Sequence, residues 1–207
     1  MPGRPGHSVG LTRAGILRAA LALADREGLK ALSMRRLGAE LGVEAMTIYH
    51  HVPNKDALLD GLVEQLVAQI APPTFEAVTW QEGLRDYARE LRSTLLAHAN
   101  VVPLVASRPA VTAQNLRVME AALQSMRAAG LHPADALDVL YAVTGFVVGH
   151  VVTAADGDPV DQFEALDPAT FPLLAEAVSR SAPRGTEARF DFALDALLSG
   201  LGPDALD

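Results

Sequence analysis

The chain has 207 residues, half of them hydrophobic, with a mean hydropathy of +0.19, so it holds enough apolar material for a sizeable core. The chain favours an all-α fold, because it has 36 alanines, 30 leucines and few aromatic residues. It has no cysteine, which excludes disulfides, thiolate metal sites and cysteine nucleophiles. The net charge of −8 divides unevenly: residues 1–55 carry eight basic and four acidic side chains, and the remainder carries nine and twenty-one. This asymmetry predicts a short nucleic-acid-binding module on an acidic body, although chance clustering would look the same.

No signal for secretion or membrane insertion is visible in the sequence. Residues 1–10 contain no apolar segment of the kind that a signal peptide needs. The longest apolar stretch, residues 139–155, is shorter than the roughly 20 residues of a membrane span, and no basic residues flank it. We therefore expect a soluble, cytoplasmic protein with no membrane partner.

The N-terminal segment predicts a tail followed by a first helix. Residues 1–11 are rich in proline and glycine and favour a flexible tail. Thr12 is a suitable N-cap, and the apolar residues after it recur at helical spacing as far as Gly28, a typical C-terminal glycine.

The next two helices form a helix-turn-helix pattern. Ser33 is expected to cap a short helix that Gly42 ends, and residues 44–51 form the following helix. Two short helices joined by a few residues, with glycine at the corner, are typical of this DNA-binding motif.

A fourth helix connects this module to the rest of the chain. Pro53 prevents the preceding helix from continuing, and Asn54 caps a helix over residues 54–70. Its apolar stripe is wide, so we expect other elements to cover it. Residues 12–70 are therefore predicted to form the DNA-binding domain.

The second predicted domain covers residues 79–202 and begins after a proline-containing boundary at residues 71–78. Thr79 and Glu82 have capping-box spacing at the start of its first helix. A short segment, residues 101–107, follows that helix. Further helices are expected over residues 111–129, from Pro133 to about residue 155, from Asp167-Pro168 to about residue 179, and from Thr186 to about Gly200. Residues 156–167 are expected to form a loop.

One segment resembles a known family. Residues 32–62 contain Thr47-x-Tyr49-x-His51, a turn at Pro53, and Asn54-Lys55-x-x-Leu58. This combination resembles the DNA-binding segment of the TetR family of bacterial transcriptional repressors. The resemblance implies an all-α protein: an N-terminal three-helix helix-turn-helix domain and a C-terminal helical bundle for ligand binding and dimerisation.

The resemblance also implies which residues contact an operator. Helix-turn-helix proteins present the N-terminal end of the recognition helix to the major groove. Arg35 is the candidate for reading guanine, and Tyr49 and Lys55 suit phosphate contacts. The predicted DNA-binding set is Arg35, Ala45, Met46, Thr47, Tyr49, His50 and Lys55. The tetracycline repressors have Gln-Pro in place of Ala45-Met46, so the operator sequence is expected to differ.

Other interpretations of these residues remain open. Tyr49 would also suit packing inside the module, and Met46 would suit a surface position without a base contact. His50 and His51 are adjacent on a helix and point about 100° apart, which does not favour a shared metal ion. We expect no metal site and no cofactor.

The resemblance continues more weakly into the second domain, through residues 79–85, residues 95–98, Arg108-Pro109 and Gly149. The ligand-binding positions of the tetracycline repressors do not carry over. By resemblance, Leu104 replaces a magnesium-binding histidine, Tyr87 an asparagine, Ala122 a glutamine and Thr153 a glutamate. A site built for a polar ligand loses much affinity when its polar groups become apolar, so magnesium–tetracycline is not the expected effector.

The replaced positions favour a larger apolar effector with a few polar handles. Simple core packing by the same residues is the alternative. The predicted ligand-binding set is Tyr87, Leu91, Leu104, Met119, Ala122, Leu123, Leu140 and Thr144.

A homodimer is expected by the same resemblance, with the helix from Pro133 and the last helix forming the interface. Independently, the helix from Pro133 is too apolar around its circumference for one core face, and Gly145 and Gly149 permit close approach. Dimerisation would place two recognition helices about 34–36 Å apart, the spacing of a palindromic operator. Ligand binding would move the helix at residues 54–70 through residues 101–107.

Together these features predict a ligand-responsive, dimeric repressor released from a palindromic operator by a small apolar effector. Alternatives are a regulator without a small ligand, an activator, a scaffolding dimer that has lost DNA binding, and, remotely, a small helical enzyme. The sequence contains no recognisable Ser-His-Asp set, phosphate-binding glycine loop, paired carboxylates or His-Glu-x-x-His motif, so we expect no enzymatic activity.

Overall fold

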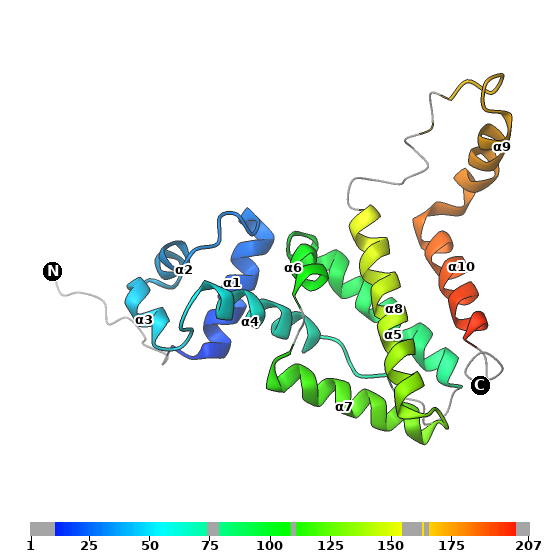
Figure 1. The fold of residues 1–207 in the computed structure, drawn as a ribbon. Coiled ribbons are helices and arrows are strands. Elements are labelled where there is room, and N and C mark those ends of the chain that lie inside the picture. Colours follow the sequence, from blue (N-terminus) through cyan, green and yellow to red (C-terminus); the bar gives the residue numbers. More distant parts are fainter. Residues whose placement is uncertain (1–10, 74–78, 109–110, 155–162, 164–165, 202–207) are drawn as a thin grey trace.

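The computed structural model describes residues 11–73, 79–108, 111–154, 163 and 166–201. Within these ranges the chain forms helices and no strands, which confirms the all-α prediction (Figure 1). Almost all of the predicted N-terminal tail and most of the predicted loop at residues 156–167 lie outside the described residues.

The N-terminal part of the chain folds into α1 (Arg13–Glu27), α2 (Met34–Leu41), α3 (Ala45–Tyr49) and α4 (Lys55–Val67), at the left of Figure 1. All three predicted N-caps are confirmed. The side chains of Thr12, Ser33 and Asn54 accept hydrogen bonds from backbone N–H groups three residues on, over 3.1, 3.1 and 2.8 Å. These caps satisfy amide groups that would otherwise lack partners at the helix ends.

Gly38 and Gly61 allow the N-terminal helices to pack closely, and Gly42 allows the turn after α2. A Cβ atom at Gly38 in α2 would lie 2.8 Å from the backbone oxygen of Val43 in the turn before α3. A Cβ atom at Gly61 in α4 would lie 2.4 Å from Cδ2 of Leu17 in α1. Gly42 ends α2 with a φ of +67°, a conformation that other residues rarely adopt. The sharp turn between α2 and α3 therefore depends on small residues.

The remainder of the chain is a helical bundle. Its elements are α5 (Trp80–Ala97), η1 (Ala99–Val101), α6 (Val102–Ser107), α7 (Ala113–Ala128), α8 (Pro133–Ala154), α9 (Pro172–Ser181), η3 (Ala182–Arg184) and α10 (Gly185–Gly200). Helix α8 packs against α5, α6, α7 and α10. The capping box at the start of α5 is confirmed, since Thr79 and Glu82 bond each other's backbone N–H groups.

Several helix boundaries differ from those expected. Helix α9 begins at Pro172 rather than at Pro168, because Asp167 instead closes a turn by accepting a hydrogen bond from the backbone N–H of Ala169. The third helix is shorter than residues 44–51, covering only Ala45–Tyr49. The short segment at residues 101–107, which the sequence predicts to be interrupted at Pro103, is a continuous helix from Val102. Pro103 lies in its first turn, where a proline removes no intrahelical hydrogen bond.

The apolar core has two clusters. One joins α1 to α4 and also includes Val101 of η1 and Leu104 of α6. The other lies among α5, α7, α8 and α10. The segment η1–α6 follows α5 in the bundle but contributes to the core of the N-terminal helices, so it forms a physical link between the two parts.

Candidate DNA-binding surface and effector cavity

Helix α3 has one buried face and one exposed face. Ile48 is fully buried against α1, α2 and α4. Met46 and Tyr49 have 64% and 42% of their surface exposed, and Thr47 and His50 are also exposed. Tyr49 is therefore partly covered by the module and partly available at its surface. Anchored mainly by Ile48, α3 presents Met46, Thr47 and Tyr49 to the solvent, as a recognition helix must.

The remaining predicted DNA-binding residues differ in their surroundings. Ala45 is half-buried and packs against the N-terminal core. Lys55 is exposed in the first turn of α4, where backbone N–H groups favour an anion such as phosphate.

The two adjacent arginines of α2 have different partners. Arg36 pairs with Glu27 and Glu40, so its charge is neutralised within the fold. Arg35 is exposed and forms no ion pair with any described residue. Arg35 is therefore the arginine of α2 that is available to a polyanion, and its contact with DNA stays a prediction.

A cavity of about 700 Å³ lies between the end of α4, the segment after it, and α5, α6, α7 and α8. This volume is in the range of small-molecule sites. The cavity is lined by Val63, Val67, Ile70, Ala71, Pro72, Pro73, Tyr87, Leu91, Val105, Ala106, Ser107, Arg108, Val111, Asn115, Leu116, Val118, Met119, Ala122, Leu140, Tyr141, Thr144, Gly145, Val148 and Gly149.

Six of the eight residues predicted to bind an effector line this cavity: Tyr87, Leu91, Met119, Ala122, Leu140 and Thr144. Leu104 does not, because α6 turns it toward α1 and α4, where it is buried in the N-terminal core. Leu123 also lies elsewhere and packs against the core of the bundle. The expectation that these two leucines line the cavity is therefore wrong, whereas effector binding by the other six stays a prediction.

Most of the cavity wall was not predicted from the sequence. Val63, Val67 and Ile70 bring α4 itself to the cavity, a consequence of the wide apolar stripe on that helix. Arg108, directly after α6, and Asn115 of α7 add polar groups. Nothing in the sequence distinguishes Asn115 from the other polar residues of α7.

Two hydroxyl groups in the cavity satisfy each other. The hydroxyl oxygens of Tyr87 on α5 and Thr144 on α8 lie 3.4 Å apart. Burial is the main cause that raises the pKa of Tyr87 above its ordinary value, so its hydroxyl stays protonated at neutral pH. The pair forms a polar patch in an otherwise apolar wall.

Arg108 connects the cavity to the DNA-binding helices. Its guanidinium donates to Asp56 Oδ1 at 2.6 Å and to Asp60 Oδ1 at 2.7 Å, both on α4. Hydrogen bonds to these carboxylates raise the pKa of Arg108. A molecule in the cavity therefore contacts a residue that is bonded to the start of α4, directly after the recognition helix.

A second contact holds the two parts together. His98, which follows α5, has Nδ1 2.9 Å from Asp25 Oδ2 in α1 and Nε2 3.3 Å from Gln69 Oε1 after α4. Asn100 donates to the backbone oxygen of Asp25 over 2.9 Å. The C-terminal end of α1 is thus fastened to the bundle.

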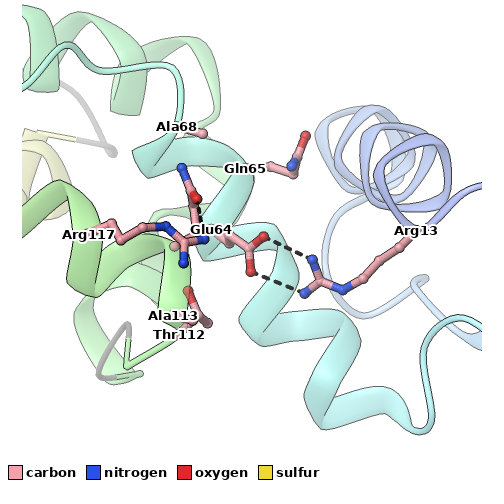
Figure 2. A pocket seen from close by; sticks show the side chains of 8 residues that line it. Arg13, Glu64, Gln65, Ala68, Thr112, Ala113 and Arg117 are labelled. Carbon is pink, nitrogen blue, oxygen red and sulfur yellow. Dashed lines mark hydrogen bonds and ion pairs between the residues drawn. The ribbon is translucent and has the colours of Figure 1, made fainter.

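A separate open groove of about 490 Å³ runs between α1, α4 and α7 (Figure 2). In it, Arg13 of α1 donates two hydrogen bonds to the Glu64 carboxylate of α4, at 2.9 and 3.1 Å. Arg117 of α7 lies on the opposite side. The Arg13–Glu64 pair ties α1 to α4.

The fold and the two sites define a helix-turn-helix DNA-binding protein with a regulatory helical bundle. Family models agree: "Bacterial regulatory proteins, tetR family" matches residues 16–62, and "Tetracyclin repressor-like, C-terminal domain" matches residues 72–203. The chain therefore belongs to the TetR family of transcriptional regulators.

Individual relatives are transcription factors. The transcriptional repressor Rv1353c of Mycobacterium tuberculosis is 33% identical over 205 residues, covering 90% of this chain and 78% of the relative. The class E tetracycline repressor of Escherichia coli is 32% identical over 190 residues, covering 89% and 88%. The structure of ActR from Streptomyces coelicolor in complex with actinorhodin has a TM-score of 0.81 and 28% identity, covering 93% and 96%.

Proposed function

We propose that this chain is a homodimeric repressor that binds a palindromic DNA operator and is released by a small, largely apolar effector. The observation that carries DNA binding is the exposed face of α3, with the unpaired Arg35 before it and Lys55 after it. Family membership and the names of the repressor relatives support the same conclusion.

The effector would bind in the cavity between α4 and α8. Its walls are mainly aliphatic, which supports an apolar effector over magnesium–tetracycline. ActR, a structural neighbour, has been solved with actinorhodin, which supports a small-molecule effector for this chain.

The link between the cavity and DNA would run through Arg108. An effector that pushes α6 away from α4 strains the bonds from Arg108 to Asp56 and Asp60, and α4 carries α1 with it through Glu64. The effector must bind the conformation without DNA more tightly, since only a difference in affinity shifts the population.

Dimerisation would use α8 and α10. Phe192 on α10 is 64% exposed and Val152 on α8 is 45% exposed, whereas a partner helix would bury both. Gly145 and Gly149 of α8 also line the cavity, and nothing lies within 4 Å of a Cβ atom added at either, so a partner helix could approach α8 closely beside the cavity. Helix α8 is long and apolar enough to cross a membrane, but its contacts with four other helices fit a core helix of a DNA-binding protein in the cytoplasm.

Selection of bound sequences from a random duplex DNA library, at a stated salt concentration, tests this proposal. The wild type should recover a palindrome. Lys55→Ala should reduce that enrichment strongly, because it removes a phosphate contact at the start of α4. Lys30→Ala is the matched control, because it removes the same charge from an exposed position away from α3. Lys30 follows the C-terminal end of α1, which the Asp25–His98 contact fastens to the bundle.

The outcomes separate the alternatives. A palindrome that depends on Lys55 and not on Lys30 supports a dimeric DNA reader. No enrichment from native protein, followed by enrichment after unfolding and refolding, indicates a co-purified effector. No enrichment after refolding would overturn the repressor proposal.

A further inference from the structure

Asn115 is the one buried polar residue among those the structure describes, with 5% of its surface exposed. It lies in the first turn of α7 and lines the effector cavity. Neither Oδ1 nor Nδ2 of its side chain has a hydrogen-bond partner among the described residues. Buried amide groups are almost always paired, so this exception requires an explanation.

Helix capping does not explain it. At α7 the Thr112 side chain accepts from the backbone N–H of Asn115 over 3.2 Å, which completes one half of a capping box. At α5 the side chain of Glu82, the residue in the same position, accepts a hydrogen bond from the backbone N–H of Thr79 over 2.9 Å. The side chain of Asn115 accepts no such bond from Thr112, because it is buried at the cavity instead. The local backbone therefore does not need this amide.

The other half-buried polar side chains of the cavity have partners. Tyr87 and Thr144 bond each other, and Arg108 bonds Asp56 and Asp60. Ser107 is exposed and donates to the backbone oxygen of Pro103, and Tyr141 has 60% of its surface exposed, so its hydroxyl can bond water. Asn115 differs in being buried with free donor and acceptor atoms. A buried, unpaired amide weakens the ligand-free fold, whereas a ligand that pairs with it removes that penalty.

We propose that Asn115 determines effector specificity by binding a neutral group that offers a hydrogen-bond donor and an acceptor side by side. A carboxamide, a lactam, or a hydroxyl next to a carbonyl has this chemistry, because the asparagine amide presents one acceptor oxygen and one donor NH₂. The rest of the effector contacts the aliphatic wall. This inference rests on the proposed effector function of the cavity and adds the chemical class of its ligand.

Measuring the affinity of two probes for the wild type and for several variants tests the inference. Naphthalene-2-carboxamide carries the donor–acceptor pair, and 2-isopropylnaphthalene has a similar shape without it. Calorimetric titration of each probe into the full-length protein gives the affinity ratio of the two. The wild type should favour the carboxamide, and Asn115→Leu should lower that ratio at least about tenfold, since a ligand amide would face an apolar side chain.

Two further variants serve as controls. Gln114→Leu makes the same change one residue away, outside the cavity, and should keep the wild-type ratio. Asn115→Ala removes the amide without adding bulk, and it keeps the test valid if leucine perturbs folding. A second readout is the Tm without ligand, which should not fall in Asn115→Leu because an unpaired buried amide is removed.

The inference is overturned by an unchanged probe ratio in both Asn115 variants, by a lower ligand-free Tm in both, or by no binding of either probe to the wild type. DNA selection with the same preparations distinguishes this failure from failure of the proposed function. Enrichment of a palindrome by a protein that does not discriminate the probes refutes only the role of Asn115. Discrimination without DNA enrichment refutes the repressor function and leaves the ligand chemistry standing.

Discussion

Replacement of Gly38 by alanine should disturb the helix-turn-helix at its tightest point. The added Cβ atom would lie 2.8 Å from the backbone oxygen of Val43 and 3.3 Å from the backbone nitrogen of Ala45. Ordinary van der Waals contact begins near 3.4 Å. Both neighbours are backbone atoms, so no side chain can turn aside, and the turn must move away from α2.

The magnitude follows from two opposing effects. Alanine favours a helix over glycine by about 0.5–1 kcal/mol, whereas forced overpacking costs about 1–3 kcal/mol. The expected net loss is about 1–2 kcal/mol, which lowers the Tm of a chain of this size by about 2–8 °C. A shift of α3 that breaks one base contact should also weaken operator binding by about 1–3 kcal/mol, or about 5- to 150-fold.

Circular dichroism melting and fluorescence anisotropy on the selected operator measure both effects. Gly200→Ala is the control, because nothing lies within 4 Å of its added Cβ at the end of α10. Wild-type Tm and operator affinity in Gly38→Ala would refute the reasoning.

Three further predictions concern the N-cap of α4, the half-buried His150 and the cavity. Asn54→Ala should lower the Tm by about 2–4 °C, because it removes about 1 kcal/mol of N-cap stabilisation from α4. Asn54→Asp keeps an oxygen that can cap the helix and should keep the Tm. Equal Tm values for the two variants would contradict this prediction. Burial, with a smaller effect of the Arg92 guanidinium, lowers the pKa of His150 below its ordinary value of 6.5. As the pH falls below about 6.5, the histidine is protonated in the unfolded chain before it is protonated in the folded chain, so the wild type loses stability. The Tm of His150→Phe should therefore rise relative to that of the wild type as the pH is lowered from about 7.5 to about 5.5. A Tm difference that does not change with pH would contradict this prediction. Tetracycline with magnesium should leave the wild-type Tm unchanged in differential scanning fluorimetry; a clear rise would refute the interpretation of the cavity.

Several features of this protein could be predicted from local sequence because their causes are local. Thr12, Ser33, Asn54 and Thr79 cap helices through bonds that reach only three residues along the chain. The DNA-binding module was equally visible, since its motif lies within one short segment. Where a boundary was wrong, as at Asp167, a competing local turn used the same carboxylate.

The cavity was predicted less well because it depends on the direction in which each side chain points after packing. Tyr87, Leu91 and Thr144 line it as expected, but the short helix α6 directs Leu104 into the core of the N-terminal helices. Helical spacing assigns residues to one face of a helix and does not say which neighbour that face will meet.

The sequence by itself therefore determined the helices, the sharp turn of the DNA-binding module and the membership of that module in its family. Only the tertiary structure decided that Arg36 is neutralised while Arg35 stays free, that Arg108 joins the cavity to α4, and that the Asn115 amide is buried without a partner. The physical reason is sequence separation. Caps and turns are satisfied by near neighbours, whereas a cavity and its polar groups are defined by helices that are distant along the chain and meet only in the packed fold.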